Sequence, residues 1–317
     1  MSAVTLNDVA RVAAVSKSTV SNVIRGAAHV APATRTRVEE AIRELGYRPN
    51  GVARALRERS TRTLGLLVPE PVNAFYAQLA LGVERHAQRE GFGVLIANTG
   101  CEPAREKAQV EALVARRVDG VAIGGLTRGS EVHDLLLDRG IPVVLAACGA
   151  SPDARLGMVD VDDEGALGEV AAHLAGLGHR RVAFVRHQLA EAGAERRAEA
   201  FAEAARKHGL ELVSLSARPT AIVAHNDLLA VTQIDVLERA GLRVPDDVSV
   251  VGFDDIPLAA HHRIELTTVR ADAVAVGEHS ARLLLEAIRD GRHVSRTEVQ
   301  PAHLVPRGST AAPPRAA

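Results

Sequence analysis

Residues 5–26 read TLNDVARVAAVSKSTVSNVIRG and carry two short runs of helical periodicity separated by only a few residues. In the first run apolar side chains recur at the spacing of one helix face, and these are Leu6, Val9, Ala10 and Ala13. In the second run Ser16 is placed to cap a helix, whose inward face carries Val20, Val23 and Ile24. Two short helices joined by a tight turn are a common means of placing a helix in the major groove of DNA.

The outer face of the second helix is polar. Its leading turns carry short or basic side chains, namely Lys17, Ser18, Ser21 and Asn22. In the major groove Asn can bond to an adenine edge and Lys to a guanine edge, while Ser can bond to a base or a phosphate. We therefore predict that this helix reads a DNA sequence.

A third helix is predicted after these two, with Pro32 near its start and Gly46 at its end. One face of it carries Val38, Ala41, Ile42 and Leu45. The alternative is a three-helix bundle without a role in nucleic-acid binding. Charge argues against that alternative, because residues 1–62 hold 11 Arg and Lys against 5 Asp and Glu, although the whole chain has a net charge of −1. A basic front and an acidic body favour phosphate contact at one end only.

From residue 63 short apolar runs alternate with amphipathic segments. The first series has the strands LGLLVP, GVLIAN, GVAIGG and PVVLAA, with helices at about 75–90, 103–117 and 130–139. The second series has the strands RVAFV, TAIVA and VSVVGF, with helices at about 163–177, 194–208 and 227–240. Such alternation predicts an α/β fold of parallel sheets covered by helices on both faces. Two sheets joined by crossing strands form a clamshell, and ligands bind between its lobes, at the carboxyl ends of the strands.

The sequence contains no apolar run near the roughly 18 residues of a membrane span and no hydrophobic signal core. We therefore expect a cytoplasmic protein with no membrane partner. Cys101 and Cys148 have no metal-ligand spacing, and a disulfide between them is not expected in a reducing compartment.

Motifs of catalysis are missing from the sequence. It has no G-x-S-x-G elbow, no phosphate-binding loop, no H-E-x-x-H and no C-x-x-C pair. Adjacent Asp254 and Asp255 would point to opposite sides of an extended segment, so they do not form an acid/base pair. The neighbouring His261 and His262 are typical of a polar loop. We expect no enzyme activity, no cofactor and no metal.

The phrases TLNDVA, VSKSTVS and TRTRVEEAIRELGYRPNGVARALR resemble the DNA-binding head of the LacI/GalR family of bacterial transcription regulators. The resemblance implies that Lys17, Ser18 and Asn22 meet operator bases, and that residues 50–57 form a hinge helix whose Leu56 wedges into the minor groove. Such a wedge unstacks a base step and kinks the duplex. The DNA-binding residues expected are Thr5, Ser16, Lys17, Ser18, Thr19, Ser21, Asn22, Arg25, Asn50, Ala53 and Leu56. One departure is Ala14, where the family has Gly; an Ala at positive φ is strained by roughly 1 kcal/mol.

The resemblance continues through the body in LGVERHAQREGF, RRVDGVAIGG, LGHRRVAFV, RPTAIVAHNDLLA and DVSVVGFDD. It implies that Arg197, Asn226 and Asp254 bind a small-molecule effector, with Phe75 as an apolar platform. The alternative for each polar residue is a surface ion pair or a helix cap.

Two departures concern this effector site. Ala147 and Cys148 follow GIPVVL where the family has an Asp, so one hydroxyl-binding carboxylate is missing. About a dozen residues precede TAIVA where the family has an extra strand and helix, and ELVSLSARP cannot supply both. Either ELVSLS is the surviving end of that helix, or the lobe has an altered edge. We predict a weakened or unresponsive effector site.

The expected fold is a helix-turn-helix three-helix head followed by a two-lobed, periplasmic-binding-protein-like effector domain with a shortened second lobe. The head covers residues 1–46, the hinge helix and linker 47–62, and the effector-binding and dimerisation domain 63–308. Lobe 1 comprises about 63–159 and 270–296, lobe 2 about 160–269 and 297–308, and 309–317 form a disordered tail. LVPRGS near the C-terminus matches a phrase with which the family ends.

The expected function is that of a transcriptional repressor, with activation as an alternative. A homodimer would bind a palindromic operator in double-stranded DNA. A small-molecule effector, a carbohydrate by resemblance, would modulate the binding. A regulator that has lost its effector response is a second alternative. A solute-binding protein of a transport system is a third, although it would have no use for a basic helical head.

Overall fold

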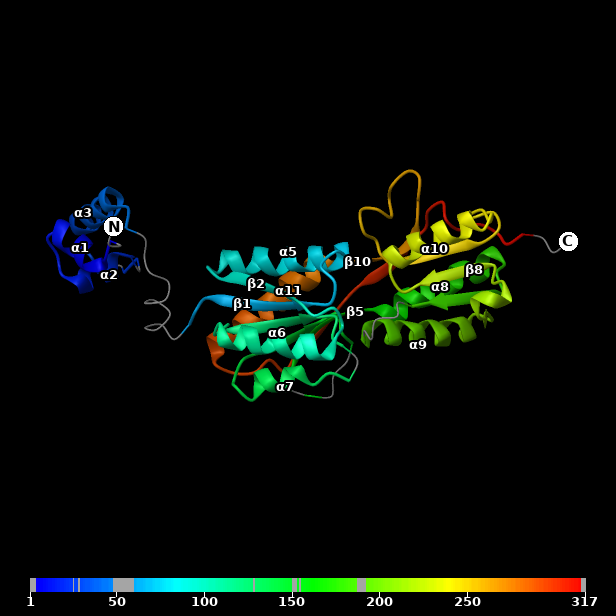
Figure 1. The fold of residues 1–317 in the computed structure, drawn as a ribbon, viewed down its shortest axis with the longest axis horizontal. Coiled ribbons are helices and arrows are strands. Elements are labelled where there is room, and N and C mark those ends of the chain that lie inside the picture. The colour runs from blue at the N-terminus through cyan, green and yellow to red at the C-terminus, as the bar shows by residue number, and fades with distance from the viewer. Residues whose placement is uncertain are drawn as a thin grey trace. The chain divides into compact units, whose positions relative to one another are not determined.

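The computed structural model of the chain describes residues 4–24, 26–27, 29–47, 60–127, 129–149, 153, 155–186 and 192–314. It divides the chain into two compact units, Met1–Thr61 and Arg62–Ala317, which are called the head and the body below (Figure 1). Arg25 and most of the expected hinge segment, with Asn50, Ala53 and Leu56, lie outside the described residues. Among the described residues no helix has the length and apolar character needed to cross a membrane.

The head consists of the three predicted helices, α1 (Leu6–Val12), α2 (Lys17–Ile24) and α3 (Pro32–Leu45). Their common core contains Val9, Val20 and Val38, which are fully buried. Ser16 caps α2 as predicted, because its Oγ accepts a hydrogen bond of 3.1 Å from the amide of Thr19. Pro32 begins α3 and Gly46 ends it in the left-handed conformation.

Two details of the head bear on the sequence predictions, one in the turn between α1 and α2 and one within α2. Ala14 has φ of 51°, so the positive φ expected for this departure from Gly is confirmed. The prediction that Ser21 faces outward is wrong, because Ser21 is 6% exposed. Ser21 precedes Ile24 by three residues and therefore lies on the same side of α2, where its small side chain packs inward.

The body contains two sheets of six strands. The first sheet has the order β11-β5-β4-β3-β1-β2, and its strands are β11 (Thr297–Gln300), β5 (Gly157–Val161), β4 (Val143–Ala146), β3 (Gly120–Gly124), β1 (Thr63–Val68) and β2 (Gly93–Asn98). All neighbouring strands of this sheet are parallel. One face is covered by α5 (Ala74–Arg89) and α11 (Ala273–Asp290), and the other by α6 (Pro103–Ala115) and α7 (Val132–Leu137) (Figure 1). This sheet and its helices are called lobe 1.

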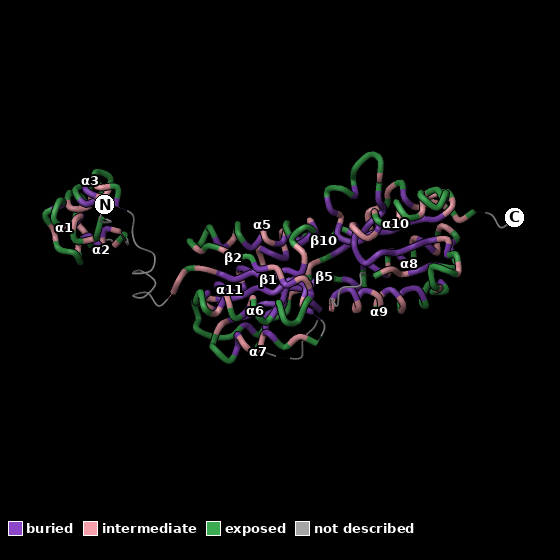
Figure 2. The backbone as a smooth tube through the Cα atoms, viewed as in Figure 1, coloured by how far each residue is buried: buried purple, intermediate pink, exposed green. Residues whose placement is uncertain are grey.

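The second sheet has the order β12-β10-β9-β8-β6-β7. Its strands are β12 (Ala302–Val305), β10 (Thr267–Ala271), β9 (Ser249–Asp254), β8 (Ala221–Ala224), β6 (Arg181–Val185) and β7 (Glu211–Leu212). Only the pairing of β12 with β10 is antiparallel among these strands. The helices of this lobe 2 are α8 (Asp163–Leu177), α9 (Ala192–Lys207) and α10 (Asp227–Arg239). In both lobes the central strands are buried, whereas the edge strands and the outer helix faces are more exposed (Figure 2).

Helices α5 and α11 pack closely because each has a glycine at the contact. A Cβ on Gly82 would lie 2.1 Å from the carbonyl oxygen of Val274, and one on Gly277 would lie 2.1 Å from that of Leu79. Neither position has room for a side chain. The two glycines therefore set the distance between the helices that cover lobe 1.

The chain passes between the lobes at Asp162, at Asp272 and at Pro301. The first two places are within a few residues of the expected boundaries. The third boundary was expected at residue 297, with 297–308 in lobe 2. This is wrong for residues 297–300, because β11 pairs with β5 in the first sheet. The prediction of a disordered tail from residue 309 is also wrong for the described part of it. Ser309 is 2% exposed, and its Oγ donates to the carbonyl of Val250.

The shortened part of lobe 2 has an altered edge, the second of the two alternatives. The strand survives as the two-residue β7, which pairs with β6, and the return helix is replaced by the single 3₁₀ turn η1 (Leu215–Ala217). The prediction that the segment cannot supply both a strand and its return helix is confirmed, and the helix is the element that is lost. A crossover between parallel strands ordinarily takes a dozen or more residues. Here the eight residues from 213 to 220 connect β7 to β8. They suffice because β7 has only two residues, so the chain has only a short distance to cover on its way back to the start of the next strand.

Candidate DNA-binding helix and inter-lobe site

The N-terminus of α2 presents a cluster of hydroxyl groups. Ser16 Oγ lies 2.7 Å from Ser18 Oγ and 2.8 Å from Thr19 Oγ1. Ser16, Lys17 and Ser18 are exposed, whereas Thr19 is half-buried. Helix N-termini carry a partial positive charge, which favours an anion such as a phosphate. The cluster therefore offers hydrogen-bond donors to an anionic group, and the exposed Lys17 adds a positive charge beside it.

Asn22 is half-buried, and its Nδ2 lies 3.2 Å from Nε2 of exposed His29. Helical periodicity could not indicate His29, because it lies in the connection that follows α2.

Thr5 is the N-cap of α1, in a reciprocal capping box with Asp8. Its Oγ1 donates to Asp8 Oδ2 at 2.7 Å. The hydrogen bond from the Thr5 side chain is the main reason why the pKa of Asp8 is lowered to about 2.

A small cavity lies between the lobes of the body. Its lining comprises Asn73, Phe75, Tyr76 and Ala147 from lobe 1 and Gly193, Arg197, His225, Asn226 and Asp254 from lobe 2. The structure thus brings all four predicted effector residues to one cavity. Its volume is about 10 Å³, which is the space of about one water molecule.

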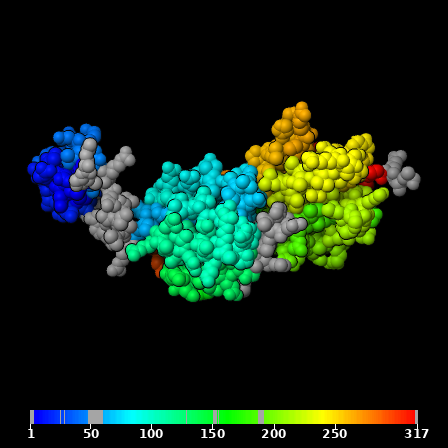
Figure 3. Space-filling view, in the orientation of Figure 1, coloured from blue at the N-terminus to red at the C-terminus, as the bar shows by residue number. Residues whose placement is uncertain are grey.

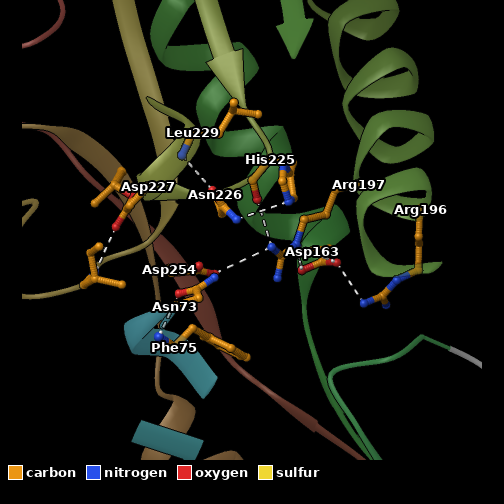
Figure 4. Close-up of polar contacts among 12 residues, drawn as sticks. Asn73, Phe75, Asp163, Arg196, Arg197, His225, Asn226, Asp227, Leu229 and Asp254 are labelled. Atoms are coloured by element: carbon orange, nitrogen blue, oxygen red, sulfur yellow. Dashed lines mark hydrogen bonds and ion pairs between the residues drawn. The ribbon is translucent and has the colours of Figure 1, made fainter. Parts of the chain in front are cut away.

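Arg197 is held on three sides within lobe 2 (Figure 4). Its Nη1 donates to the carbonyl of His225 at 2.9 Å and lies 3.6 Å from Asp254 Oδ1. Its Nε lies 3.4 Å from the carboxylate of Asp163, and its Cζ lies 3.7 Å from the ring centroid of Phe253. A guanidinium over an aromatic face gains a cation–π attraction. Arg197 is 8% exposed, so it is a fixed donor at the wall of the cavity.

Asn226 and Asp254 lie at the carboxyl ends of the neighbouring strands β8 and β9. Asn226 is two residues beyond the end of β8, and Asp254 is the last residue of β9. Asn226 caps α10, because its Oδ1 accepts a hydrogen bond of 2.8 Å from the amide of Leu229. Asn226 also lines the cavity, so the helix cap given above as an alternative does not remove it from the candidate site. Asp254 has φ of 115° and Asp255 has φ of 54°. The extended segment predicted for this pair is therefore wrong, but the two carboxylates have separate partners. Asp254 lies near Arg197, and Asp255 pairs with Arg270 and Arg307 at 2.6 Å each.

Lobe 1 contributes an aromatic wall. Phe75 and Tyr76 are packed edge to face, with ring centroids 5.4 Å apart. Asn73 caps α5 and accepts a hydrogen bond of 3.0 Å from the amide of Phe75, which fixes the first turn beside the cavity. Tyr76 and His225, which also line the cavity, were not among the residues predicted from the sequence. They could have been found from the sequence only as the immediate neighbours of the predicted residues Phe75 and Asn226.

One buried carboxylate lies directly behind the cavity. Asp227 is fully buried, and burial is the main cause that raises its pKa to about 7. Its Oδ2 accepts a hydrogen bond of 2.8 Å from the amide of Ile256, and its Oδ1 accepts one from the Thr268 hydroxyl. It thereby joins the start of α10 to the turn after Asp254.

Among the described residues, one group offers three possible metal ligands close together, namely His133, Asp134 and Asp153. Arg155 Nη2 lies 2.9 Å from Asp134 and 2.6 Å from Asp153, so a cation already neutralises both carboxylates. His261 and His262 are exposed, with ring centroids 4.5 Å apart. They lie in the segment between β9 and β10, which protrudes from lobe 2 (orange in Figure 3).

Family models match almost the whole chain. The model described as bacterial regulatory proteins of the lacI family matches residues 5–50. The periplasmic binding proteins and sugar binding domain of the LacI family match 61–215, and a periplasmic binding protein-like domain matches 211–310. The transcriptional repressor PurR of Aliivibrio salmonicida is 32% identical, with 92% of this chain and 94% of PurR covered. The chain belongs to the LacI family.

Further relatives and solved structures agree with this assignment. PurR of Aliivibrio fischeri (strain MJ11) is 34% identical over 94% of this chain and 96% of its own length. The Lac repressor dimer bound to operator and the anti-inducer ONPF has a TM-score of 0.86 at 26% identity, covering 98% of this chain and 100% of that one. The complex of the transcriptional regulator CelR with cellobiose has a TM-score of 0.71 at 30% identity, with 96% and 99% covered. This LacI-family chain is a DNA-binding transcription regulator and not an enzyme.

Proposed function

We propose that this LacI-family regulator represses transcription in the cytoplasm by binding, as a homodimer, an operator of two related half-sites. The observation that carries the proposal is the outer face of α2, where Lys17 and Ser18 are exposed on a helix anchored by Val20 and Val23. A helix presented in this way fits the major groove. A two-fold dimer would read a palindrome, and the operator-bound Lac repressor dimer supports that arrangement.

The dimer contact that we propose includes the free edge of lobe 1. Strand β2 is the last strand of its sheet, with Leu95 37% and Ile96 58% exposed. Leu81 on the neighbouring α5 is 39% exposed. An apolar edge strand in contact with water invites pairing with other chains, so proteins ordinarily cover or charge it. A second copy of the chain would cover this edge.

We propose further that the inter-lobe cavity binds a small-molecule effector through Arg197, Asn226, Asp254 and Phe75. The guanidinium, amide and carboxylate offer donors and acceptors for hydroxyl groups, and the aromatic wall offers an apolar face. This combination suits a sugar-like ligand, and the complex of CelR with cellobiose supports that class. The lobes would have to separate for such a ligand to enter.

A regulator without an effector response is the second candidate. The position at which the family has a carboxylate is occupied by Ala147, and the cavity has a volume of only about 10 Å³. The shortened edge at β7 lies beyond β6, whereas Asn226 and Asp254 follow or end β8 and β9. The shortening itself therefore leaves the side chains of the proposed site in place.

Selection of bound sequences from random duplex DNA, at stated salt, tests the DNA-binding proposal. We expect a palindromic consensus for the natural chain and its loss, or altered preference at one position of each half-site, for Lys17→Ala. Lys107→Ala removes an exposed charge from α6 in the body and should change nothing. Nonspecific binding alone by the natural chain would contradict the proposal.

Calorimetric titration with a panel of mono- and disaccharides tests the effector proposal separately. Binding that is weakened at least tenfold by Asp254→Asn would support the site. Sugar binding that Asp254→Asn and Asn226→Ala leave unchanged would contradict it, and absence of binding across the panel would favour the second candidate.

A further inference from the structure

Arg196, the neighbour of Arg197, reaches out of lobe 2 into lobe 1. Its Nη1 lies 2.6 Å from Asp160 Oδ2 and its Nη2 lies 3.0 Å from Asp160 Oδ1. Asp160 belongs to β5 of the first sheet, whereas Arg196 belongs to α9. The pair is therefore a bidentate ion pair between the lobes. Such fork-to-carboxylate contacts are strong and directional.

A carboxylate of lobe 2 also holds the Arg196 guanidinium and helps to orient it toward lobe 1. Nη2 of Arg196 also lies 2.8 Å from Asp163, whose side chain is 1% exposed and which also pairs with Arg197 (Figure 4). The Arg196 side chain is 29% exposed and that of Asp160 is 11% exposed. Partial burial reduces the screening by water that makes most surface ion pairs weak.

Lobe 1 also makes room for this guanidinium at Gly149, just after β4. A Cβ on Gly149 would lie 2.9 Å from Nε and 3.0 Å from Cδ of Arg196. Gly149 has φ of 87°, which other residues rarely adopt. The Arg196 side chain is thus enclosed by two segments of lobe 1, the end of β5 and the turn at Gly149.

The position of the contact determines what it can do. Asp160 lies just before Asp162 and Asp163, where the chain passes from the first sheet to the second. A bond across this crossing resists rotation of one lobe against the other. Arg197, by comparison, is held by Asp163, His225 and Asp254, which belong to lobe 2.

We propose that Arg196, Asp160 and Gly149 form an inter-lobe clamp that holds the lobes closed in the protein free of effector and DNA. The loop after β4 carries Ala147 instead of a carboxylate. A ligand bound to lobe 2 would therefore find no hydrogen-bonding carboxylate on this loop of lobe 1 to link the two lobes. The clamp provides that link from within the chain. Closure then depends on an internal ion pair, which would have to break before the lobes could separate to admit a ligand.

The test measures the distance between the lobes in the full chain, without DNA or effector. Spin labels on cysteines introduced at Glu111 of α6 and Glu199 of α9, both exposed, report it by pulsed electron resonance. Native Cys101 and Cys148 are buried. We expect Arg196→Gln and Asp160→Asn to shift and broaden the distance distribution alike, and the double variant to change it no more than either single variant.

Arg243→Gln is the matched control, since Arg243 makes a bidentate pair with Asp247 inside lobe 2. It should leave the distribution unchanged. Gly149→Ala supplies an independent variant that displaces Arg196 without removing a charge, and it should reproduce the shift. Unchanged distributions in both charge variants, additive changes in the double variant, or an equal change in the control would each overturn the clamp. These readouts need neither operator nor effector, so they are independent of the proposed function.

Discussion

Asp227 combines full burial with two hydrogen bonds to segments that are distant in sequence, at the amide of Ile256 and the hydroxyl of Thr268. Gly252 leaves space for it, because a Cβ there would lie 2.1 Å from Asp227 Oδ1. The carboxyl is thus built into the wall behind the proposed effector site. Its raised pKa of about 7 has a consequence for stability.

The folded state holds the Asp227 proton more tightly than the unfolded state, whose carboxyl has the ordinary value of 3.8. The stabilisation is therefore complete below about pH 4 and is lost as pH rises through about 7, with an upper bound on the order of 4 kcal/mol. Asp227→Asn removes this dependence and leaves one buried group unsatisfied, at a cost of about 1–3 kcal/mol.

Denaturant unfolding of the natural chain and Asp227→Asn at pH 5 and pH 8 measures this effect. We expect the natural chain to lose free energy of unfolding relative to the variant as pH rises between these values. A difference between the two proteins that does not change with pH would show that the proton on Asp227 has no such role.

The glycines of α5 and α11 determine how closely these two helices approach. Gly82→Ala would place a methyl group against the backbone of α11 at Val274. The helices would have to move apart, and we expect a loss of about 1–3 kcal/mol in the free energy of unfolding. Gly168→Ala in α8, where a Cβ meets nothing within 4 Å, is the control. It should be neutral or stabilising by up to about 1 kcal/mol, and equal losses for the two variants would contradict the packing argument.

The elements that the sequence predicted are those with a complete local pattern. Apolar runs bounded by turn residues predicted β1 to β4, and β6, β8 and β9, and long amphipathic segments predicted the helices between them. Strand β11, TEVQ, has no apolar run, because it is an edge strand that depends on pairing with β5. Strand β7 is too short to leave a pattern. Pairing partners distant in the chain decide such elements, and a local window does not contain them.

The same distinction applies to the candidate site. Family resemblance indicated Arg197, Asn226, Asp254 and Phe75, and the structure gathers them around one cavity. The resemblance did not indicate the ion pair between Arg196 and Asp160. That contact forms only when the two lobes fold against each other. Ser21 was assigned to the wrong side of α2, since a small polar residue on the flank of a helix can face either way.

At the scale of the whole molecule, the free edge of lobe 1 yields a test of the dimer. Ile96→Glu places a charge on the exposed face of β2, where Ile96 is opposite Leu66 of β1. We expect sedimentation velocity to show a dimer for the natural chain and a shift toward monomer for this variant, with at least tenfold weaker association. Val299→Glu, at the opposite edge strand β11, where Val299 is 59% exposed, is the control. Loss of the dimer in the control alone would place the contact elsewhere.

The three passages between the lobes also determine the order in which the molecule can be completed during synthesis. Lobe 1 takes its covering helix α11 and its edge strand β11 from residues 273–300, after nearly all of lobe 2. The head, in contrast, has its whole core within the first 47 residues. A chain that emerges from the ribosome with its N-terminus first would therefore carry a finished DNA-binding head long before the body can cover its first sheet. Any fragment that ends before residue 273 would have a head able to meet DNA and no completed lobe to control it.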